Sequence, residues 1–204
     1  MGRREDNKRQ KREALLAAGL AVFGAEGYDR ASIEQIVKEA GVARGTFYLY
    51  FEDKLALFRA LSSAWVDELL EIVAEVRSAL GTAGSPAEAL EIYQQMGFAI
   101  ALFGLNHQQP VIVAFRETRR AGEAGDFLRA EEQRILDAVT VITAEAAERG
   151  LIQVRDPRLT VRMIFGAVER LYFDVLTGVE LGDPTEVANE VVRTFTLAMG
   201  LSEA

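Results

Sequence analysis

Side chains that could perform catalysis or bind a metal are scarce in this sequence of 204 residues. It has no cysteine, which excludes disulfides, thiol nucleophiles and cysteine-ligated zinc or iron–sulfur clusters. Its one histidine, His107, lies in the polar run Asn106-His107-Gln108-Gln109. No glycine-rich phosphate loop, nucleophile elbow or metal-ligand pair surrounds this histidine. We therefore expect a protein that is not an enzyme and that uses neither a metal nor a cofactor.

The basic side chains are the second candidates for chemistry, because they could bind an anion. The net charge of the whole chain is −8, which by itself argues against a nucleic-acid partner. Residues 1–60, however, hold 11 Lys and Arg against 9 Asp and Glu, a local charge of +2, whereas residues 61–204 hold 12 against 22, a local charge of −10. This asymmetry indicates two separate tasks. The first dozen residues form either a solvated tail or an arm that meets DNA phosphates, through Arg3, Arg4, Lys8, Arg9, Lys11 and Arg12.

The elements that position these residues are predicted to be helices. Apolar side chains recur with the helical period, and no alternating run predicts a strand. Four amino-terminal helices are predicted, one ended by Gly27 and the others over 32–41, 43–51 and 53–80. Glycines and capped prolines delimit the later helices, which we expect over 86–105, 110–121, 126–149, 157–178 and 184–199. The predicted fold class is all-α, with about nine helices.

The second and third predicted helices are joined by a tight turn through Gly41-Val42, which is the geometry of a helix-turn-helix. In such a unit the second helix enters the major groove of DNA. Phe47 and Phe51 lie one helical turn apart and are expected to anchor this helix to the core. The opposite face is then available for DNA and consists of Arg44, Gly45, Thr46, Tyr48 and Leu49.

A dense set of residues between positions 14 and 60 matches a known pattern: Ala17-Ala18, Phe23, Gly27-Tyr28, Ser32-Ile33, Ile36, Ala40-Gly41-Val42, Gly45-Thr46, Tyr48, Tyr50-Phe51, Lys54 and Leu57. This segment resembles the amino-terminal domain of the tetracycline-repressor (TetR) family. The family consists mostly of dimeric transcriptional repressors that leave DNA when a small molecule binds the carboxy-terminal domain. The resemblance implies a helix-turn-helix DNA-binding domain with a basic arm over residues 1–52. An effector-binding and dimerisation domain would follow over residues 53–204.

The resemblance also implies two groups of DNA-contact residues. The group expected at phosphates consists of Ser32, Gln35, Tyr48, Tyr50 and Lys54. The group expected at base edges consists of Arg44, Gly45, Thr46 and Leu49. Leu49 stands where the family often has a polar residue, which favours contact with a thymine methyl group over a hydrogen bond. Ala43 stands where the family often has a serine, so one helix-start N–H group lacks its usual acceptor.

The last two predicted helices are apolar around most of their circumference, as is typical of helices that lie in a core or against a partner. In the resembled family these helices pair with their symmetry mates, which implies a homodimer that binds a palindromic operator. The residues expected at the interface are Phe165, Tyr172, Val191 and Phe195. The alternative is that these side chains form the internal core of a monomer.

An effector pocket is expected among residues of the carboxy-terminal region: Met96, Phe98, Phe103, His107, Phe115, Arg119, Phe127, Phe165 and Tyr172. Each of these apolar side chains could instead be an ordinary core residue. Arg116, Arg119 and Arg120 form a basic cluster that is either solvated or available to an acidic effector. We expect a largely apolar effector, such as a fatty acyl-CoA.

Two further expectations concern the function without an effector and the location of the protein. The alternative to a ligand-responsive repressor is an architectural or partner-controlled DNA-binding protein that has no effector. The longest strongly apolar stretch, over 96–105, is shorter than the roughly 20 residues of a membrane-spanning helix. The amino terminus is charged and has no apolar targeting segment, so we expect a cytoplasmic protein without a membrane partner.

Overall fold

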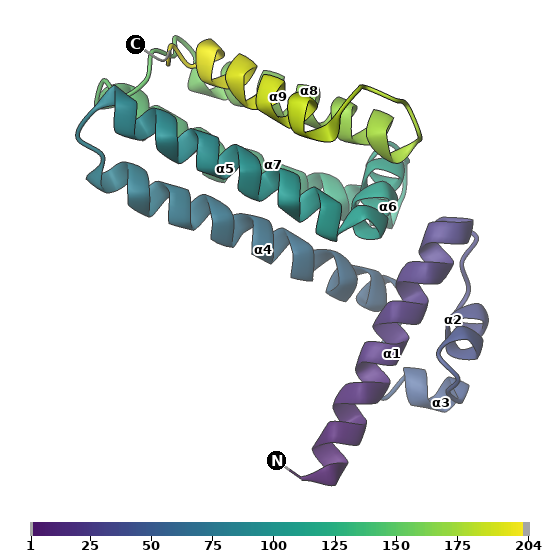
Figure 1. The fold of residues 1–204 in the computed structure, drawn as a ribbon. Coiled ribbons are helices and arrows are strands. Elements are labelled where there is room, and N and C mark those ends of the chain that lie inside the picture. Colours follow the sequence, from purple (N-terminus) through teal and green to yellow (C-terminus); the bar gives the residue numbers. More distant parts are fainter. Residues whose placement is uncertain (1, 202–204) are drawn as a thin grey trace. The chain divides into compact units, whose positions relative to one another are not determined.

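A computed structural model describes residues 2–201 of the chain, apart from the side chains of Arg3, Arg4 and Pro184. Over these residues the fold is all-α, as predicted (Figure 1). The helices are α1 (Arg3–Glu26), α2 (Ile33–Glu39), α3 (Arg44–Phe47), α4 (Lys54–Thr82), α5 (Pro86–Asn106), α6 (Gln108–Thr118), α7 (Glu123–Glu148), α8 (Pro157–Leu176) and α9 (Pro184–Ala198). Within this range no single helix has the length and hydropathy to cross a membrane, and only the bent pair α5 and α6 passes that test jointly.

Several helices begin at the capping residues that the sequence predicts. The Ser32 hydroxyl accepts the backbone N–H of Gln35 at 3.2 Å, and the Gln35 side chain accepts the backbone N–H of Ser32 at 2.9 Å. Ser85, Asp156 and Asp183 each accept a backbone N–H of the helix that follows, with proline next in the chain. The expected start of a helix at Pro110 was wrong, because α6 already begins at Gln108. Proline is tolerated there, since the first-turn N–H groups have no partner within the helix.

The third helix is shorter than predicted, because α3 covers only Arg44–Phe47 instead of 43–51. The chain after α3 tightens into turns, in which Leu49 N–H donates to the Thr46 carbonyl at 3.2 Å and Tyr50 N–H donates to the Phe47 carbonyl at 2.9 Å. Ala43 precedes the helix without a side-chain cap, as expected. The tight turns bring the chain from α3 to the start of α4 within a few residues.

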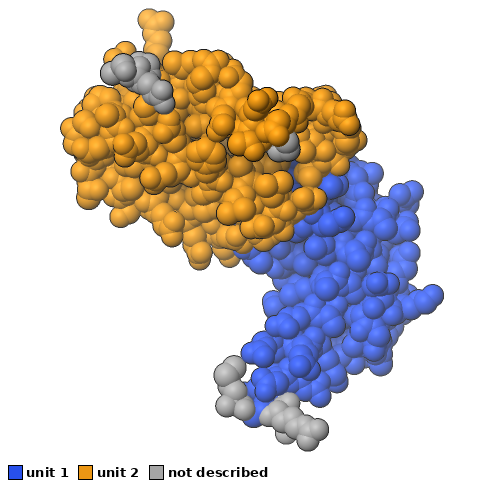
Figure 2. Space-filling view, in the orientation of Figure 1, with its two compact units in different colours: residues 1–65, 109–131 blue, residues 66–108, 132–204 orange. Residues whose placement is uncertain are grey.

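The chain divides into two compact units, coloured separately in Figure 2. Unit 1 comprises residues 1–65 and 109–131, and unit 2 comprises residues 66–108 and 132–204. Unit 1 therefore combines the helix-turn-helix with nearly all of α6 and the beginning of α7. The functional division expected between residues 52 and 53 remains a prediction.

The core of unit 1 joins the helix-turn-helix to α6 and α7. Phe23 of α1 and Phe58 of α4 meet edge to face, with 5.3 Å between ring centroids, and both are fully buried. Val113 of α6 and Leu128 of α7 are buried in the same hydrophobic cluster. The helix-turn-helix therefore shares one core with elements that lie more than 50 residues further along the chain.

Unit 2 is a layered helical body in which α4, α5 and α9 run side by side (Figure 1). Its core combines Val73 and Val76 of α4, Tyr93 of α5 and Ile142 of α7. α9 lies in close contact with α5. Met199, directly after α9, completes this core.

Candidate nucleic-acid interface

The face of α3 that the sequence assigns to DNA is exposed. Phe47 and Phe51 are buried in the core of unit 1 and fix the inner side of this segment. Gly45, Tyr48 and Leu49 lie on the surface, and Leu49 is 77 % exposed. A large apolar side chain that is this exposed contributes almost no hydrophobic stabilisation to the fold. Its position is consistent with a side chain that contacts a partner.

Arg44 lies on this surface and is held by two neighbours. Its guanidinium forms an ion pair with Glu34 of α2 and lies 3.5 Å from the Tyr48 hydroxyl. The hydrogen bond to Tyr48 and the charge of Glu34 raise the pKa of Arg44. Exposed ion pairs of this kind contribute little to stability. Arg44 can therefore exchange Glu34 for a phosphate or a guanine edge at small cost.

The predicted phosphate-contact residues at the start of α2 already have local structural roles. Ser32 and Gln35 form the capping box of α2, and the Ser32 hydroxyl also donates to the side-chain oxygen Oε1 of Gln35 at 3.0 Å. Gln35 is exposed, whereas Ser32, Thr46 and Tyr50 are half-buried. Their contacts with DNA remain predictions.

Lys54 is the predicted contact residue whose surroundings differ most from the expectation. Its ammonium group donates to the carbonyls of Tyr28 at 2.7 Å and Ala31 at 2.9 Å. It also lies 4.3 Å from the centre of the Tyr28 ring, a cation–π contact. In this structure Lys54 stabilises the connection between α1 and α2, residues 27–32, rather than facing solvent at the end of a helix.

The basic arm expected at the amino terminus is helical from Arg3 onward, as part of α1. The side chains of Arg3 and Arg4 lie outside the described set. Arg9 lies between Asp6 at 3.5 Å and Glu13 at 3.7 Å, and Arg12 lies 5.7 Å from the centre of the Phe51 ring. Contact between this segment and DNA remains a prediction.

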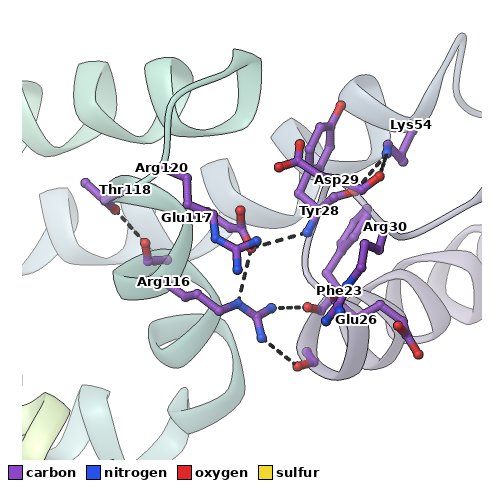
Figure 3. Close-up of polar contacts among 12 residues, drawn as sticks. Phe23, Glu26, Tyr28, Asp29, Arg30, Lys54, Arg116, Glu117, Thr118 and Arg120 are labelled. Atoms are coloured by element: carbon purple, nitrogen blue, oxygen red, sulfur yellow. Dashed lines mark hydrogen bonds and ion pairs between the residues drawn. The ribbon is translucent and has the colours of Figure 1, made fainter.

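A polar cluster in unit 1 is not predicted from the sequence, which singled out Tyr28 and Arg116 but not Glu117 (Figure 3). Glu117 of α6 is buried and accepts the backbone N–H of Tyr28 at 3.2 Å. Arg116 donates to the Gly24 carbonyl at 3.0 Å and to the Phe23 carbonyl. Arg116 is therefore engaged within the protein and is not freely available to an acidic effector. The hydrogen bond between Tyr28 and Glu117 joins residues that are 89 positions apart, so no local sequence pattern predicts it.

The Tyr28 side chain extends the same cluster into α7. Its hydroxyl donates to Glu123 at the start of that helix. Burial, followed by the hydrogen bond to Glu123, raises the pKa of Tyr28 well above its usual range. The tyrosine therefore stays neutral at physiological pH and acts as a donor.

The nine predicted pocket residues fall into both units. Phe115, Arg119 and Phe127 belong to unit 1, while Met96, Phe98, Phe103, His107, Phe165 and Tyr172 belong to unit 2. Phe127 packs against the core of unit 1, where Arg59 lies 5.5 Å from the centre of its ring. In unit 2 the His107 ring lies 4.4 Å from that of Phe103, and His107 Nε2 lies 2.9 Å from the Glu68 carboxylate. A common pocket formed by these residues remains a prediction.

A small apolar cavity in unit 1 lies among α1, α4 and α6. It is lined by Leu20, Phe23, Phe58, Leu61, Ser62, Trp65, Pro110, Val113 and Ala114. Its volume of about 20 Å³ has room for a single water molecule, so an effector of any size would have to enlarge it. None of the predicted pocket residues lines this cavity.

Tyr93 is a residue of unit 2 that the sequence analysis missed. Its side chain is buried between α4, α5 and α7, and within the described part of the chain its hydroxyl has no hydrogen-bond partner. Burial raises the pKa of Tyr93 to about 12, an effect that the nearby Thr143 hydroxyl partly offsets. The Thr143 hydroxyl itself donates to the Val139 carbonyl. Tyr93 thus places a hydroxyl, close to that of Thr143, within the core of unit 2.

The residues expected at a dimer interface are half-buried within the single chain. Tyr172 is directed toward α5, where its hydroxyl donates to the Ile100 carbonyl at 2.7 Å. Only glycine fits at position 104 beside it, because a Cβ atom there would lie 2.1 Å from the tyrosine ring. Phe165, Val191 and Phe195 are also half-buried. The apolar side chains that α8 exposes are others, among them Leu159 and Met163. Dimerisation remains a prediction.

The fold and the exposed α3 define a protein of the helix-turn-helix class. Residues 15–61 match the sequence model of the family described as "Bacterial regulatory proteins, tetR family". Residues 15–61 therefore carry the sequence pattern of this family, and the chain is similar to transcriptional regulators of the tetR type.

Relatives agree with this assignment. The uncharacterized HTH-type transcriptional regulator YvdT of Bacillus subtilis is 46 % identical over 61 residues, but the match covers only 30 % of this chain and 31 % of that protein. The "Fatty acid metabolism regulator protein" of the same organism is 24 % identical over 91 % of this chain and 94 % of its own length. The solved structure of the transcriptional regulator FadR from Bacillus subtilis, in complex with stearoyl-CoA, shares the fold. Its TM-score is 0.66 at 22 % identity, over 91 % of this chain and 98 % of the other.

Proposed function

We propose that this regulator is a homodimeric repressor that binds a palindromic operator and is released by a largely apolar effector of the fatty acyl-CoA class. The observation that carries the DNA-binding part is the exposed face of α3, where Arg44, Tyr48 and Leu49 lie together outside the core. A helix that presents a cation and an apolar side chain for base readout, beside a hydroxyl that can bind a phosphate, has the groups needed for DNA recognition.

The exposed side of α8 supports the dimer. Leu159 and Met163 are exposed and lie one helical turn apart. Gly166 and Ala167 continue the same face with small side chains, which allow a second helix to approach closely. In a two-fold dimer the two α3 helices address half-sites that are separated by about 34–36 Å or a multiple of it.

Two observations support an acyl-CoA effector. One relative that matches 91 % of this chain is named for fatty acid metabolism, and the FadR structure of the same fold contains stearoyl-CoA. In this chain the Tyr93 hydroxyl is buried in the core of unit 2, where it has no hydrogen-bond partner among the described residues. A thioester carbonyl at the end of an apolar acyl chain would supply that acceptor.

A mobility-shift titration with operator DNA tests this proposal. Stearoyl-CoA is expected to weaken operator binding by about five- to 150-fold, the usual range of coupling between two ligands. Free coenzyme A, which lacks the acyl chain, should have no such effect. Tyr93→Phe should bind the operator normally and respond to stearoyl-CoA more weakly than the unaltered protein. Release by no acyl-CoA of any chain length would contradict the effector class and favour an architectural DNA-binding protein.

A further inference from the structure

The connection between α1 and α2 is held from two sides by charged side chains (Figure 3). On one side, Lys54 of α4 donates to the carbonyls of Tyr28 and Ala31. On the other side, Glu117 of α6 accepts the N–H of Tyr28. The backbone N–H and the backbone carbonyl of Tyr28 are thus both hydrogen-bonded to side chains that are distant in sequence. These two contacts attach the connection to α4 on one side and to α6 on the other.

Glu117 is the centre of the α6 side. It is only 2 % exposed, and its carboxylate lies 3.2 Å from Arg116 Nε and 3.6 Å from Arg120 Nη1. A buried carboxylate needs such partners, because an unpaired charge would be strongly destabilising. Arg116 also donates to the Gly24 carbonyl in the last turn of α1, where carbonyls lack partners within the helix. One cluster therefore contacts the end of α1 and the connection that follows.

Gly27 shows how closely this cluster approaches the backbone. Its φ angle is +82°, a conformation that disfavours every residue with a side chain. A Cβ atom at this position would also lie 2.9 Å from the Arg120 guanidinium and 3.3 Å from the Glu117 carboxylate. Glycine is thus required both for the backbone angle and for space.

The connection determines where the DNA-reading helices begin. Ser32, the capping residue of α2, follows it directly, and α2 and α3 are only 7 and 4 residues long. Helices this short do not hold their own conformation or orientation, which must come from tertiary contacts. A shift of the connection would therefore move α2 and the exposed face of α3 that follows it.

We propose that Glu117, with Arg116, is a positioning residue for DNA recognition: it fixes the connection between α1 and α2 from α6, so that α3 fits the operator. Glu117 does not touch DNA in this account. The inference rests on the DNA-binding part of the proposed function and goes beyond it, because it makes sequence-specific binding depend on a residue about 70 positions after α3.

Three variants test this role by separating specific from non-specific binding. Glu117→Ala removes both the acceptor for Tyr28 and the charge facing Arg116. Glu117→Gln keeps an acceptor oxygen and removes only the charge, so it remains informative if the alanine variant does not fold. Asp126→Asn is the matched control, because it removes a charge from a carboxylate of the same unit that is 74 % exposed and pairs with Arg129.

The affinity of each variant is measured by fluorescence anisotropy with operator DNA and with an unrelated duplex of equal length. The temperature is chosen so that circular dichroism shows each variant fully folded. We expect Glu117→Ala to weaken operator binding by about five- to 100-fold, the effect of losing one base contact. Binding to the unrelated duplex should change by no more than about twofold, because non-specific binding depends on phosphate charge. Glu117→Gln should lie between the alanine variant and the unaltered protein, and Asp126→Asn should match the unaltered protein.

A purely structural role predicts a different result and would overturn the inference. In that case the Glu117 variants would unfold at lower temperature, while the ratio of specific to non-specific affinity in the folded protein stayed unchanged. Lys54→Met, which removes the contact from the opposite side of the connection, should lower the same ratio. Failure of the unaltered protein to bind any duplex is a separate result, seen before variants are compared. That result would overturn the DNA-binding proposal and this inference together.

Discussion

Arg44→Ala is expected to weaken operator binding by about five- to 100-fold and to relax the base preference at one position of each half-site. The side chain lies at the start of α3, on the exposed face, and its neighbour Glu34 holds it only through a surface ion pair. An arginine that forms two hydrogen bonds with a guanine contributes about 1–3 kcal/mol of discrimination against other bases. The measurement is anisotropy with the operator and with a set of its single-base variants.

Tyr48→Phe is the comparison for Arg44→Ala. It removes one hydroxyl from the same face and leaves the ring in place, so a phosphate contact is lost without a base contact. Binding should weaken by a similar factor on the operator and on all of its variants. An Arg44→Ala protein with an unchanged pattern of base preferences would show that Arg44 is not a base-reading residue.

The second large effect is expected from Met163→Glu on the outer face of α8. Met163 is 66 % exposed in the single chain, so a charge there costs little unless a partner covers it. In a dimer the substitution buries two like charges near the symmetry axis, and the dimer should dissociate. A monomer engages only one half-site, so operator affinity should fall by roughly 10²–10⁴-fold through loss of avidity. Sedimentation equilibrium measures the association state, and anisotropy measures the affinity.

Leu105→Glu provides the matched control for this experiment. Leu105 lies on α5 and is 60 % exposed, so the substitution introduces the same charge at a similarly exposed apolar position of unit 2. It should leave both the dimer and operator binding intact. Dissociation by Leu105→Glu together with an intact dimer in Met163→Glu would place the interface on α5 and contradict the proposed use of α8.

Local sequence chemistry was sufficient to predict most of the helices. Ser32, Ser85, Asp156 and Asp183 cap the helices that they precede, because a side-chain oxygen next to a free backbone N–H acts within a few residues. The length of α3 was not predictable in this way. The buried side chains of Phe47 and Phe51 determine where α3 ends. These two residues are four positions apart whether the chain between them is helical or forms turns, so their spacing does not distinguish the two.

The roles of individual charged residues depended on contacts that no local pattern contains. Lys54 is predicted to contact a phosphate, which remains a prediction, and its ammonium group also binds carbonyls more than 20 positions earlier in the chain. Arg116 was noticed as part of a basic cluster, and its partners in α1 lie more than 90 positions away. Charge patterns show where cations are frequent, whereas only the packing of unit 1 decides which of them remain available to DNA.

The net charge of −8 for the whole chain also conceals a difference in charge between its two parts. The acidic excess lies after residue 60, and the segment with the helix-turn-helix is slightly basic. Since the electrostatic attraction to phosphates falls off within about 10 Å at moderate salt, the local charge decides the interaction and the distant charge contributes little.

This chain is expected to bind DNA through unit 1, and a salt-titrated mobility shift with the DNA flanking its own gene tests this expectation most directly. Each phosphate that a Lys or Arg neutralises contributes about −0.9 to the slope of log affinity against log salt concentration. We predict a complex at low salt whose affinity falls with a slope of several units, and the same slope for Tyr48→Phe, because the hydroxyl that it removes carries no charge. The absence of a complex at low salt, or an affinity that does not depend on salt, would contradict this expectation.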